Sequence, residues 1–314
     1  MQTSLRPRKQ PFGRYLRANW ALYLMSVPGL CYVIGYKLLP LVGLQLAFKD
    51  FNLFAGNGIL DAMFKSPWVG LAHFRRIFGS PSFANLLGNT LTISLMKLVV
   101  GFPLPILLAL LLNEVRNRAF SRLSQTLVYM PHFLSWVIIH GIFVTLLSAG
   151  GVVNKALDVM GAGTVSFYTN PQAFRWLLVF TEAWKETGWG AIVYLAALTA
   201  VDEELYDAAY VDGAGYFKRL WHITLPSIFP IISLMLLLRV GNILSAGGEQ
   251  ILVMYNATVY STADVLYTYI YRTGMGKLDF SSATALGLFE SLVGFVMIVA
   301  CNGISRKALG RSLW

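Results

Sequence analysis

Long runs of apolar residues constrain this chain more than any other feature of its sequence. Stretches such as residues 86–112 and 281–303 exceed the roughly 20 residues that a helix needs to cross a hydrocarbon core. Hydrophobic residues make up 56% of the 314 residues, and charged residues 13%, against about 25% in soluble domains. The mean hydropathy of +0.60 agrees. The chain is therefore predicted to be an all-α integral membrane protein, and soluble classes are excluded.

The apolar runs predict six transmembrane helices. They cover about residues 20–47, 86–112, 125–148, 175–200, 225–246 and 281–303. None shows the alternation of a barrel strand. The fourth is the least apolar, because it contains Glu182, Lys185 and Glu186. In the second, Pro103 and Pro105 predict a kink.

Basic residues are concentrated in alternate connecting segments. Thirteen of the 25 Lys and Arg residues lie in segments 1–19, 113–124, 201–224 and 304–314. The other connecting segments, 49–85, 149–175 and 247–280, hold eight. By the positive-inside rule the first set is cytoplasmic, so both termini are expected in the cytoplasm. Topology thereby explains most of the net charge of +10 without nucleic acid. We expect one membrane domain over residues 1–314, beginning with a basic cytoplasmic segment at 1–19.

The residues of a catalytic or metal site are absent from the sequence. A phosphate-binding loop requires Gly-Lys-Ser or Gly-Lys-Thr, but the single Lys-Ser pair, Lys65-Ser66, follows Phe64. There is no His-Glu-x-x-His or Cys-x-x-Cys, and the four histidines are scattered. We predict no enzyme activity, no catalytic residue and no metal site in this chain. If ATP drives this protein, another chain hydrolyses it.

The connecting segment at about 201–224 has the pattern of a short docking helix. Acidic residues at 202–204 favour the positive end of a helix dipole. Leu205, Ala208, Ala209 and Asp212 follow at helical spacing, and Gly213 allows the helix to stop. The small residues of this face allow a partner to approach closely on the cytoplasmic side.

This segment resembles the EAA loop of permeases in type I, maltose-permease-like bacterial ABC importers. The resemblance is carried by Asp207-Ala208-Ala209, Asp212-Gly213-Ala214 and Ile223-Thr224-Leu225-Pro226. Asp207 stands where the family usually has Glu, and Asp202 where Pro is common. The resemblance implies a type I permease fold and a coupling helix seated in a cleft of an ATPase subunit. The ATPase-coupling residues it implies are Glu204, Asp207, Ala208, Ala209, Asp212 and Gly213.

Further segments resemble the polysaccharide-type branch of that family, which is associated with alginate uptake. They are residues 189–190, 194–198, 248–251, 269–272 and 312–314, while residues 70–74 resemble the segment that leads into the second span in the family as a whole. The resemblance implies a sugar permease of the bacterial inner membrane that works with a second, different permease, two ATPase subunits and an extracytoplasmic binding protein. It implies no cofactor in this chain, because ATP and Mg are bound by the ATPase subunits.

Charged residues inside the predicted spans are candidates for a carbohydrate pathway, because ionisable groups are costly there. At similar depths lie Lys37, Lys97, Lys185, Arg239, Glu182, Glu186 and Glu290. Carboxylates bind sugar hydroxyls and an indole stacks on a sugar ring. The pathway residues we expect are Glu182, Lys185, Trp189, Arg239 and Glu249. The alternative is that these charges, for example Glu182 with Lys185, are ion pairs that hold the bundle together.

The excess of one base over the acids, four against three, decides little by itself; together with the resemblance to the polysaccharide-type branch it favours an acidic, alginate-like oligosaccharide as the substrate. A secondary sugar transporter driven by an ion gradient is the alternative function. That alternative leaves the loop at 201–224 unexplained, as does a membrane protein that transports nothing.

Overall fold

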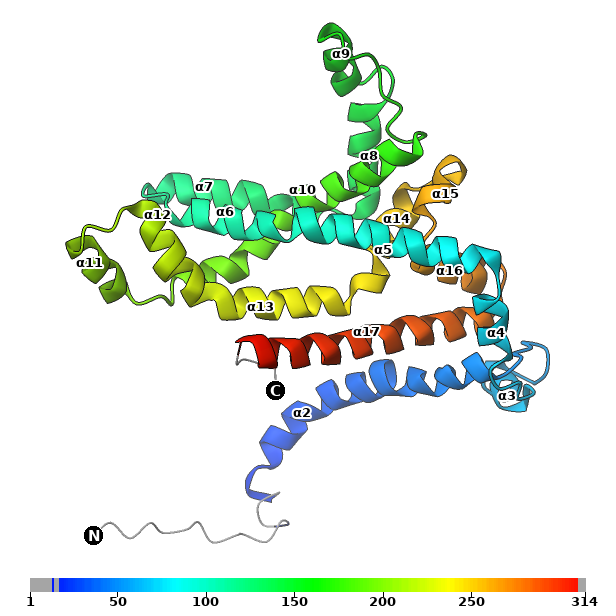
Figure 1. The fold of residues 1–314 in the computed structure, drawn as a ribbon. Helices are drawn as coiled ribbons and strands as arrows, with labels where there is room; N and C mark the ends of the chain where they lie inside the picture. The colour runs from blue at the N-terminus through cyan, green and yellow to red at the C-terminus, as the bar shows by residue number, and fades with distance from the viewer. Residues whose placement is uncertain (1–12, 14–16, 310–314) are drawn as a thin grey trace.

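Helices form the regular structure of this protein. The computed structural model describes residue 13 and residues 17–309, and within them strand pairing is confined to one isolated bridge between Lys49 and Trp68. The helices, labelled in Figure 1, are α2 (Trp20–Tyr32), α3 (Ile59–Lys65), α4 (Ala72–Phe78), α5 (Pro81–Gly101), α6 (Pro103–Asn113), α7 (Arg118–Tyr129), α8 (Trp136–Leu147), α9 (Val152–Val159), α10 (Pro171–Leu198), α11 (Glu203–Val211), α12 (Tyr216–Arg219), α13 (Leu225–Gly241), α14 (Gly248–Met254), α15 (Tyr260–Ala263), α16 (Leu266–Tyr271) and α17 (Phe280–Leu309). The predicted all-α class is confirmed.

Among the residues that the structure describes, five segments are long and apolar enough to span a membrane. They are Trp20–Phe48, Pro81–Asn113, Trp136–Val159, Tyr216–Gly241 and Phe280–Lys307. The first continues beyond α2 through wider and then tighter helical turns from Val33 to Phe48. The fourth predicted span is present as the 28-residue helix α10, but its charged residues set it apart from the other five. The count of six crossings and the side of the termini therefore stay predictions.

The second predicted span is divided at its prolines. Helix α5 ends at Gly101 and α6 begins at Pro103, while the expected kink stays a prediction. A proline cannot donate the backbone hydrogen bond that would continue the helix.

The predicted boundaries of two spans were wrong, because one span is interrupted and the other ends early. The run 125–148 is divided between α7 and α8 by a tight turn at Met130–Phe133, which contains Pro131. At the start of α8 the side chain of Ser135 accepts a hydrogen bond from the amide of Ile138. Helices α8 and α9 project away from the other long helices (Figure 1). The run 225–246 ends early, because α13 stops at Gly241.

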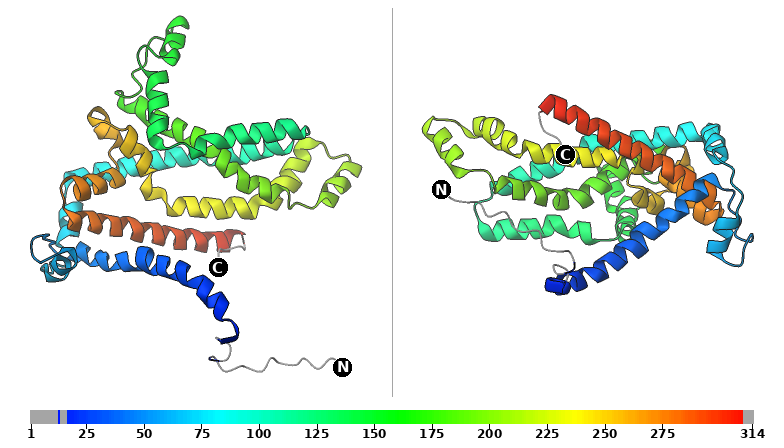
Figure 2. Two further views of the ribbon diagram at one scale, coloured as in Figure 1. Left: turned by 180° about the vertical axis from the view of Figure 1, so that it is seen from behind. Right: turned by 90° about the horizontal axis from the view of Figure 1, so that it is seen from below.

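The long helices pack in the order α6, α10, α13, α17 and first span, as Figures 1 and 2 show. Two close approaches between helix backbones occur at glycines. A Cβ at Gly188 of α10 would meet the carbonyl oxygen of Val128 at 1.8 Å, and one at Gly294 of α17 would meet that of Gly241 at 2.7 Å. Small residues at such contacts let helix backbones approach, which drives helix association in lipid.

Buried apolar residues form three clusters within the bundle. One includes Ile93, Phe174 and Ile251, a second Leu86 and Leu286, and a third Ala109, Tyr194 and Ile228. Helix α2, by contrast, has no buried residue. Its surface is available to lipid or to another chain.

The two ends of the bundle carry different elements. Helices α11 and α12 lie at one end, and the start of α2 and the end of α17 lie toward it (Figure 1). Helices α3 and α4 lie at the opposite end (Figures 1 and 2). We refer to these as the α11 end and the α3 end.

Candidate functional site

Helix α11 is the short helix predicted in the 201–224 segment. Its N-cap is Asp202, whose carboxylate accepts a hydrogen bond from the amide of Glu204 at 3.0 Å. Its end is set by Gly213, which has a φ of +71° and lies in the left-handed region. The amide of Ala214 closes the turn by donating to the carbonyl of Ala209 at 2.8 Å. The local structure that the sequence predicts is thus confirmed.

The surface of α11 is free of contacts that would bury it. None of its residues is buried, and Tyr210 and Val211 expose 73% and 86% of their area. Of the expected coupling residues, Ala209 is half-buried, and the rest are exposed: Glu204, Asp207, Ala208, Asp212 and Gly213. A hydrogen bond of 2.9 Å between the hydroxyls of Tyr206 and Thr224 joins α11 to the turn that leads into α13. Sequence reasoning missed this bond, because Tyr206 carries no special spacing.

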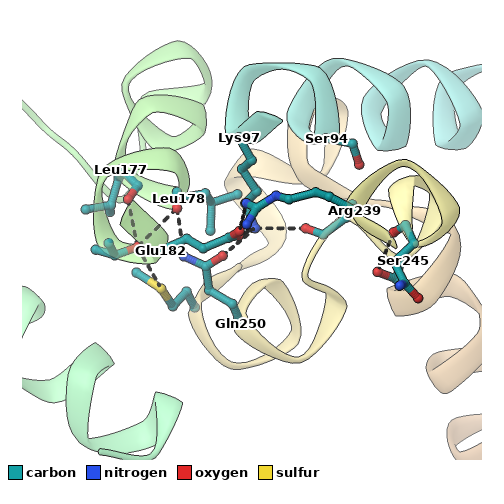
Figure 3. Close-up of polar contacts among 12 residues, drawn as sticks. Ser94, Lys97, Leu177, Leu178, Glu182, Arg239, Ser245 and Gln250 are labelled. Atoms are coloured by element: carbon teal, nitrogen blue, oxygen red, sulfur yellow. Dashed lines mark hydrogen bonds and ion pairs between the residues drawn. The ribbon is translucent and has the colours of Figure 1, made fainter. Parts of the chain in front are cut away.

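Three of the charged residues of the predicted spans, Lys97, Glu182 and Arg239, meet in a cluster to which four helices contribute (Figure 3). Glu182 of α10 binds Lys97 of α5 at 2.5 Å through one oxygen and Arg239 of α13 at 2.7 Å through the other. Gln250 of α14 accepts from the Lys97 ammonium at 2.5 Å. We call these four residues the charge cluster. It shows that Glu182 pairs across helices, and not with Lys185 as the ion-pair alternative supposed.

Lys97 is fully engaged within the charge cluster. Its ammonium has three N–H groups and three acceptors, namely Glu182, Gln250 and the carbonyl of Ala246 at 2.8 Å. Its side chain is only 3% exposed. Gln250 completes the network by donating to the carbonyl of Leu178 and the hydroxyl of Thr181, at 2.8 and 2.7 Å.

The backbone break after α13 brings these groups together. Ala246 and Gly247 have φ values of +51° and +68°, so the chain leaves helical geometry there and the Ala246 carbonyl can accept from Lys97. A Cβ at Gly247 would lie 2.5 Å from the Lys97 nitrogen and 3.0 Å from a Glu182 oxygen. Glycine is therefore required here for space and for conformation. The Gly247-Gly248 pair was the sequence signal for this break, and Gln250 gave none, because a neutral amide does not stand out in an apolar run.

Two cavities adjoin the charge cluster, and both are lined by Glu182 and Arg239. The larger, of about 370 Å³, also contacts Ser94, Lys97 and the turn from Asn242 to Gly247. The smaller, of about 150 Å³, lies nearer the α11 end of α10, beside Trp189 and Pro105. The Glu182–Arg239 pair therefore lies between them.

Lys185 has a different setting from the one expected for a pathway residue. Its ammonium donates to the carbonyls of His132 and Leu134 at 2.5 and 2.7 Å, where the chain turns between α7 and α8. Its side chain is 9% exposed and lies 4.0 Å from Glu186. Lys185 thus satisfies carbonyls that the helix break leaves without partners.

Trp189 and Glu186 lie on the same face of α10 and both contact His132. The imidazole stacks on the Trp189 indole, with ring centroids 4.4 Å apart and planes inclined by 3°. Its Nδ1 lies 2.9 Å from a Glu186 oxygen. Trp189 remains 45% exposed beside the smaller cavity. Glu249, in the first turn of α14, is exposed and lines neither cavity.

Outside this region, Glu290 of α17 lines a separate cavity on the other side of the turn after α13. In the part of the chain that the structure describes, no three His, Cys, Asp or Glu side chains are grouped as metal ligands.

Comparison with known proteins identifies related chains. Residues 101–309 match the family described as binding-protein-dependent transport system inner membrane component. Protein LplB of Bacillus subtilis (strain 168) is 44% identical over 93% of this chain and 90% of its own length. The polygalacturonan/rhamnogalacturonan transport system permease protein YteP of the same strain is 43% identical, over 91% of this chain and 88% of its own.

Two solved structures are similar along their whole length. A chain in the crystal structure of a bacterial alginate ABC transporter, in complex with alginate pentasaccharide-bound periplasmic protein, is 39% identical. It has a TM-score of 0.86 and covers 97% of this chain and 100% of that one. A chain in the crystal structure of a bacterial ABC transporter involved in the import of the acidic polysaccharide alginate is 40% identical, with a TM-score of 0.86 and coverages of 95% and 99%.

Proposed function

Since the chain belongs to the binding-protein-dependent transport system inner membrane component family, and is thus a multi-pass sugar ABC transporter permease, we propose that it imports an acidic oligosaccharide. In this proposal it is one permease of a pair. Two separate ATPase subunits bind ATP and Mg and hydrolyse the ATP, and an extracytoplasmic binding protein delivers the substrate.

The observation that carries the coupling part of this proposal is the exposure of α11. This helix, at one end of the bundle, has no buried residue and exposes Ala208 beside acidic and larger apolar side chains. In the proposed cycle the ATPase pair closes on ATP, moves the α11 helices of both permeases, and switches the bundle between outward-facing and inward-facing states. The Tyr206–Thr224 bond passes that motion from α11 to α13.

The acidic character of the substrate is supported by the balance of charge around the cluster. Lys97, Lys185 and Arg239 outnumber Glu182 and Glu186 by one positive charge in the neighbourhood of the two cavities. One relative is named for polygalacturonan/rhamnogalacturonan transport, and two solved structures are of alginate transporters, which supports an acidic substrate. We place Glu182, Arg239 and Trp189 on the pathway. Lys185 and Glu249 stay predictions with weaker geometric support.

A reconstituted importer tests this function. The chain is expressed with its partner permease and ATPase, and the ATPase rate in proteoliposomes is measured with the binding protein loaded with alginate pentasaccharide or maltopentaose. We expect the ATPase to purify with this chain and the uronate-loaded binding protein to stimulate it. Stimulation by maltopentaose alone would contradict the acidic substrate, and transport that needs no ATPase would support the ion-gradient alternative.

A further inference from the structure

The cations near the two cavities differ in how many of their hydrogen-bond donors are engaged. Lys97 uses all three on protein acceptors, and Lys185 binds two carbonyls and lies near Glu186. Arg239, with five N–H groups, makes one recorded hydrogen bond within the described residues, to Glu182. Arg239 is therefore the cation near these cavities that has unused hydrogen-bond donors for a further anion.

Arg239 is also the most accessible of the charge cluster's ionic groups. Its side chain is 34% exposed, against 15% for Glu182 and 3% for Lys97. Its guanidinium lies close to the break between α5 and α6, where a Cβ on Gly101 would approach it to 3.3 Å. It borders both cavities, so an anion in either one lies beside this group.

The smaller cavity places an aromatic ring beside the Arg239 guanidinium. Arg239 and Trp189 both line it, together with Glu182. A guanidinium and an indole beside one space match the carboxylate and the apolar face of a uronate ring.

We propose that the Glu182–Arg239 ion pair is a gate between the two cavities, and that a substrate carboxylate opens it by replacing Glu182 on Arg239. This inference rests on the proposed import of an acidic oligosaccharide. The guanidinium exchanges one carboxylate for another, and no covalent bond changes.

The charge balance of the cluster makes this exchange favourable. Without substrate, Lys97 and Arg239 share one carboxylate, so one positive charge is uncompensated in a partly buried site. With a substrate carboxylate on Arg239, Glu182 remains paired with Lys97, and both ion pairs are balanced. A neutral sugar offers no group that replaces Glu182 and leaves the gate closed.

The experiment uses the assembled importer in proteoliposomes with Glu182→Gln, Arg239→Gln and Arg239→Lys. Glu290→Gln is the matched control, because it removes an intramembrane carboxylate that lines neither cavity. Three quantities are measured: copurification of the ATPase, the ATPase rate with empty binding protein, and uptake of labelled alginate pentasaccharide.

Glu182→Gln should raise the saccharide-free ATPase rate at least fivefold. An amide offers one acceptor oxygen in place of two, so it keeps Lys97 and releases Arg239. Arg239→Gln should reduce alginate uptake at least tenfold. Arg239→Lys should restore at least a third of it, because the charge is retained. Glu290→Gln should stay within twofold of the wild type.

A purely structural pair gives a different pattern. Arg239→Lys would then be as defective as Arg239→Gln, and Glu182→Gln would lower the saccharide-free rate or prevent assembly. Either result overturns the gate. The wild-type importer separates this failure from failure of the proposed function. If maltopentaose stimulates it and alginate does not, the substrate assignment is wrong whatever the variants do.

Discussion

The hydroxyls of Tyr206 and Thr224 lie 2.9 Å apart and join a helix with no buried residue to the start of a long helix of the bundle. Because α11 has little other attachment, this bond is a short mechanical path from α11 to α13. Arg239 is on the same helix, α13, so displacement at α11 can reach the charge cluster along one helix.

Tyr206→Phe should weaken coupling while leaving the fold intact. It removes a hydrogen bond worth about 1 kcal/mol, so we expect transport per ATP hydrolysed to fall by roughly two- to tenfold. The measurement is the ratio of sugar uptake to phosphate release in proteoliposomes. Tyr210→Phe, at an exposed position on the same helix, is the control. Equal ratios in both variants would show that the bond transmits nothing.

Ala208→Arg should abolish substrate-stimulated ATPase activity. Arg is a good helix former, so α11 should persist, but its bulk and charge fall on an exposed alanine that the proposed ATPase cleft must contact closely. The loss of docking is measured as reduced copurification of the ATPase with this chain. Ala208→Ser, a small change at the same position, is the control. Gly213→Trp is a poorer test, because the left-handed φ of Gly213 would strain any side chain. Normal coupling in Ala208→Arg would remove α11 from the docking role.

Cysteine labelling should locate the two ends of the bundle relative to the membrane. In a background with Cys31 and Cys301 replaced, Met160→Cys should react with an impermeant thiol reagent added to intact spheroplasts, and Lys218→Cys only after lysis. Both positions are exposed, so access is decided by the membrane and not by burial. Labelling of position 218 from outside would refute the six-span topology.

Tyr168 should make the stability of the protein depend on pH in the alkaline range. Burial raises the pKa of its hydroxyl to about 12, above the value of about 10 in an unfolded chain. Between these values the unfolded chain releases the proton and the folded chain keeps it. The contribution of the protonated Tyr168 hydroxyl to the free energy of unfolding is therefore intact below a pH of about 10, and it is lost as the pH rises toward 12.

The measurement compares thermal unfolding of the wild type and Tyr168→Phe from pH 8 to pH 12. The buried hydroxyl has no recorded partner among the described residues, so the variant should be at least as stable at pH 8. Its advantage should then grow above pH 10. A difference in unfolding temperature between the two proteins that stays constant with pH would contradict the raised pKa of Tyr168.

Hydropathy predicted where the chain is apolar but not where its helices break. The first, second and sixth spans match the structure closely, because length and apolarity alone define them. The turn at Met130–Phe133 was missed because its residues remain largely apolar, so the hydropathy of the run does not change there. The local loop chemistry of α11 was predictable, since caps and glycine turns depend on near neighbours.

The partners of the charged residues could not be predicted from spacing. Lys185 follows Glu182 by three residues, which suggested a pair, but the Lys185 ammonium binds carbonyls at the break between α7 and α8. Glu182 instead meets Lys97 and Arg239, which are 85 and 57 residues away in sequence. Such contacts depend on how the helices pack together, which no local pattern contains.

The placement of the cluster's three charged residues on three successively synthesised helices constrains how the chain enters the bilayer. A Lys or Asp at the centre of a helix costs about 2.5–3.5 kcal/mol on insertion, so α10, with Glu182, Lys185 and Glu186, is a poor substrate for the translocon on its own. Helix α5 leaves the ribosome first and presents Lys97, which can neutralise Glu182 as α10 arrives. Arg239 follows on α13, after that pair can form. The newborn chain can thus hold a balanced pair while α10 inserts, and it acquires the extra cation only when α13 joins.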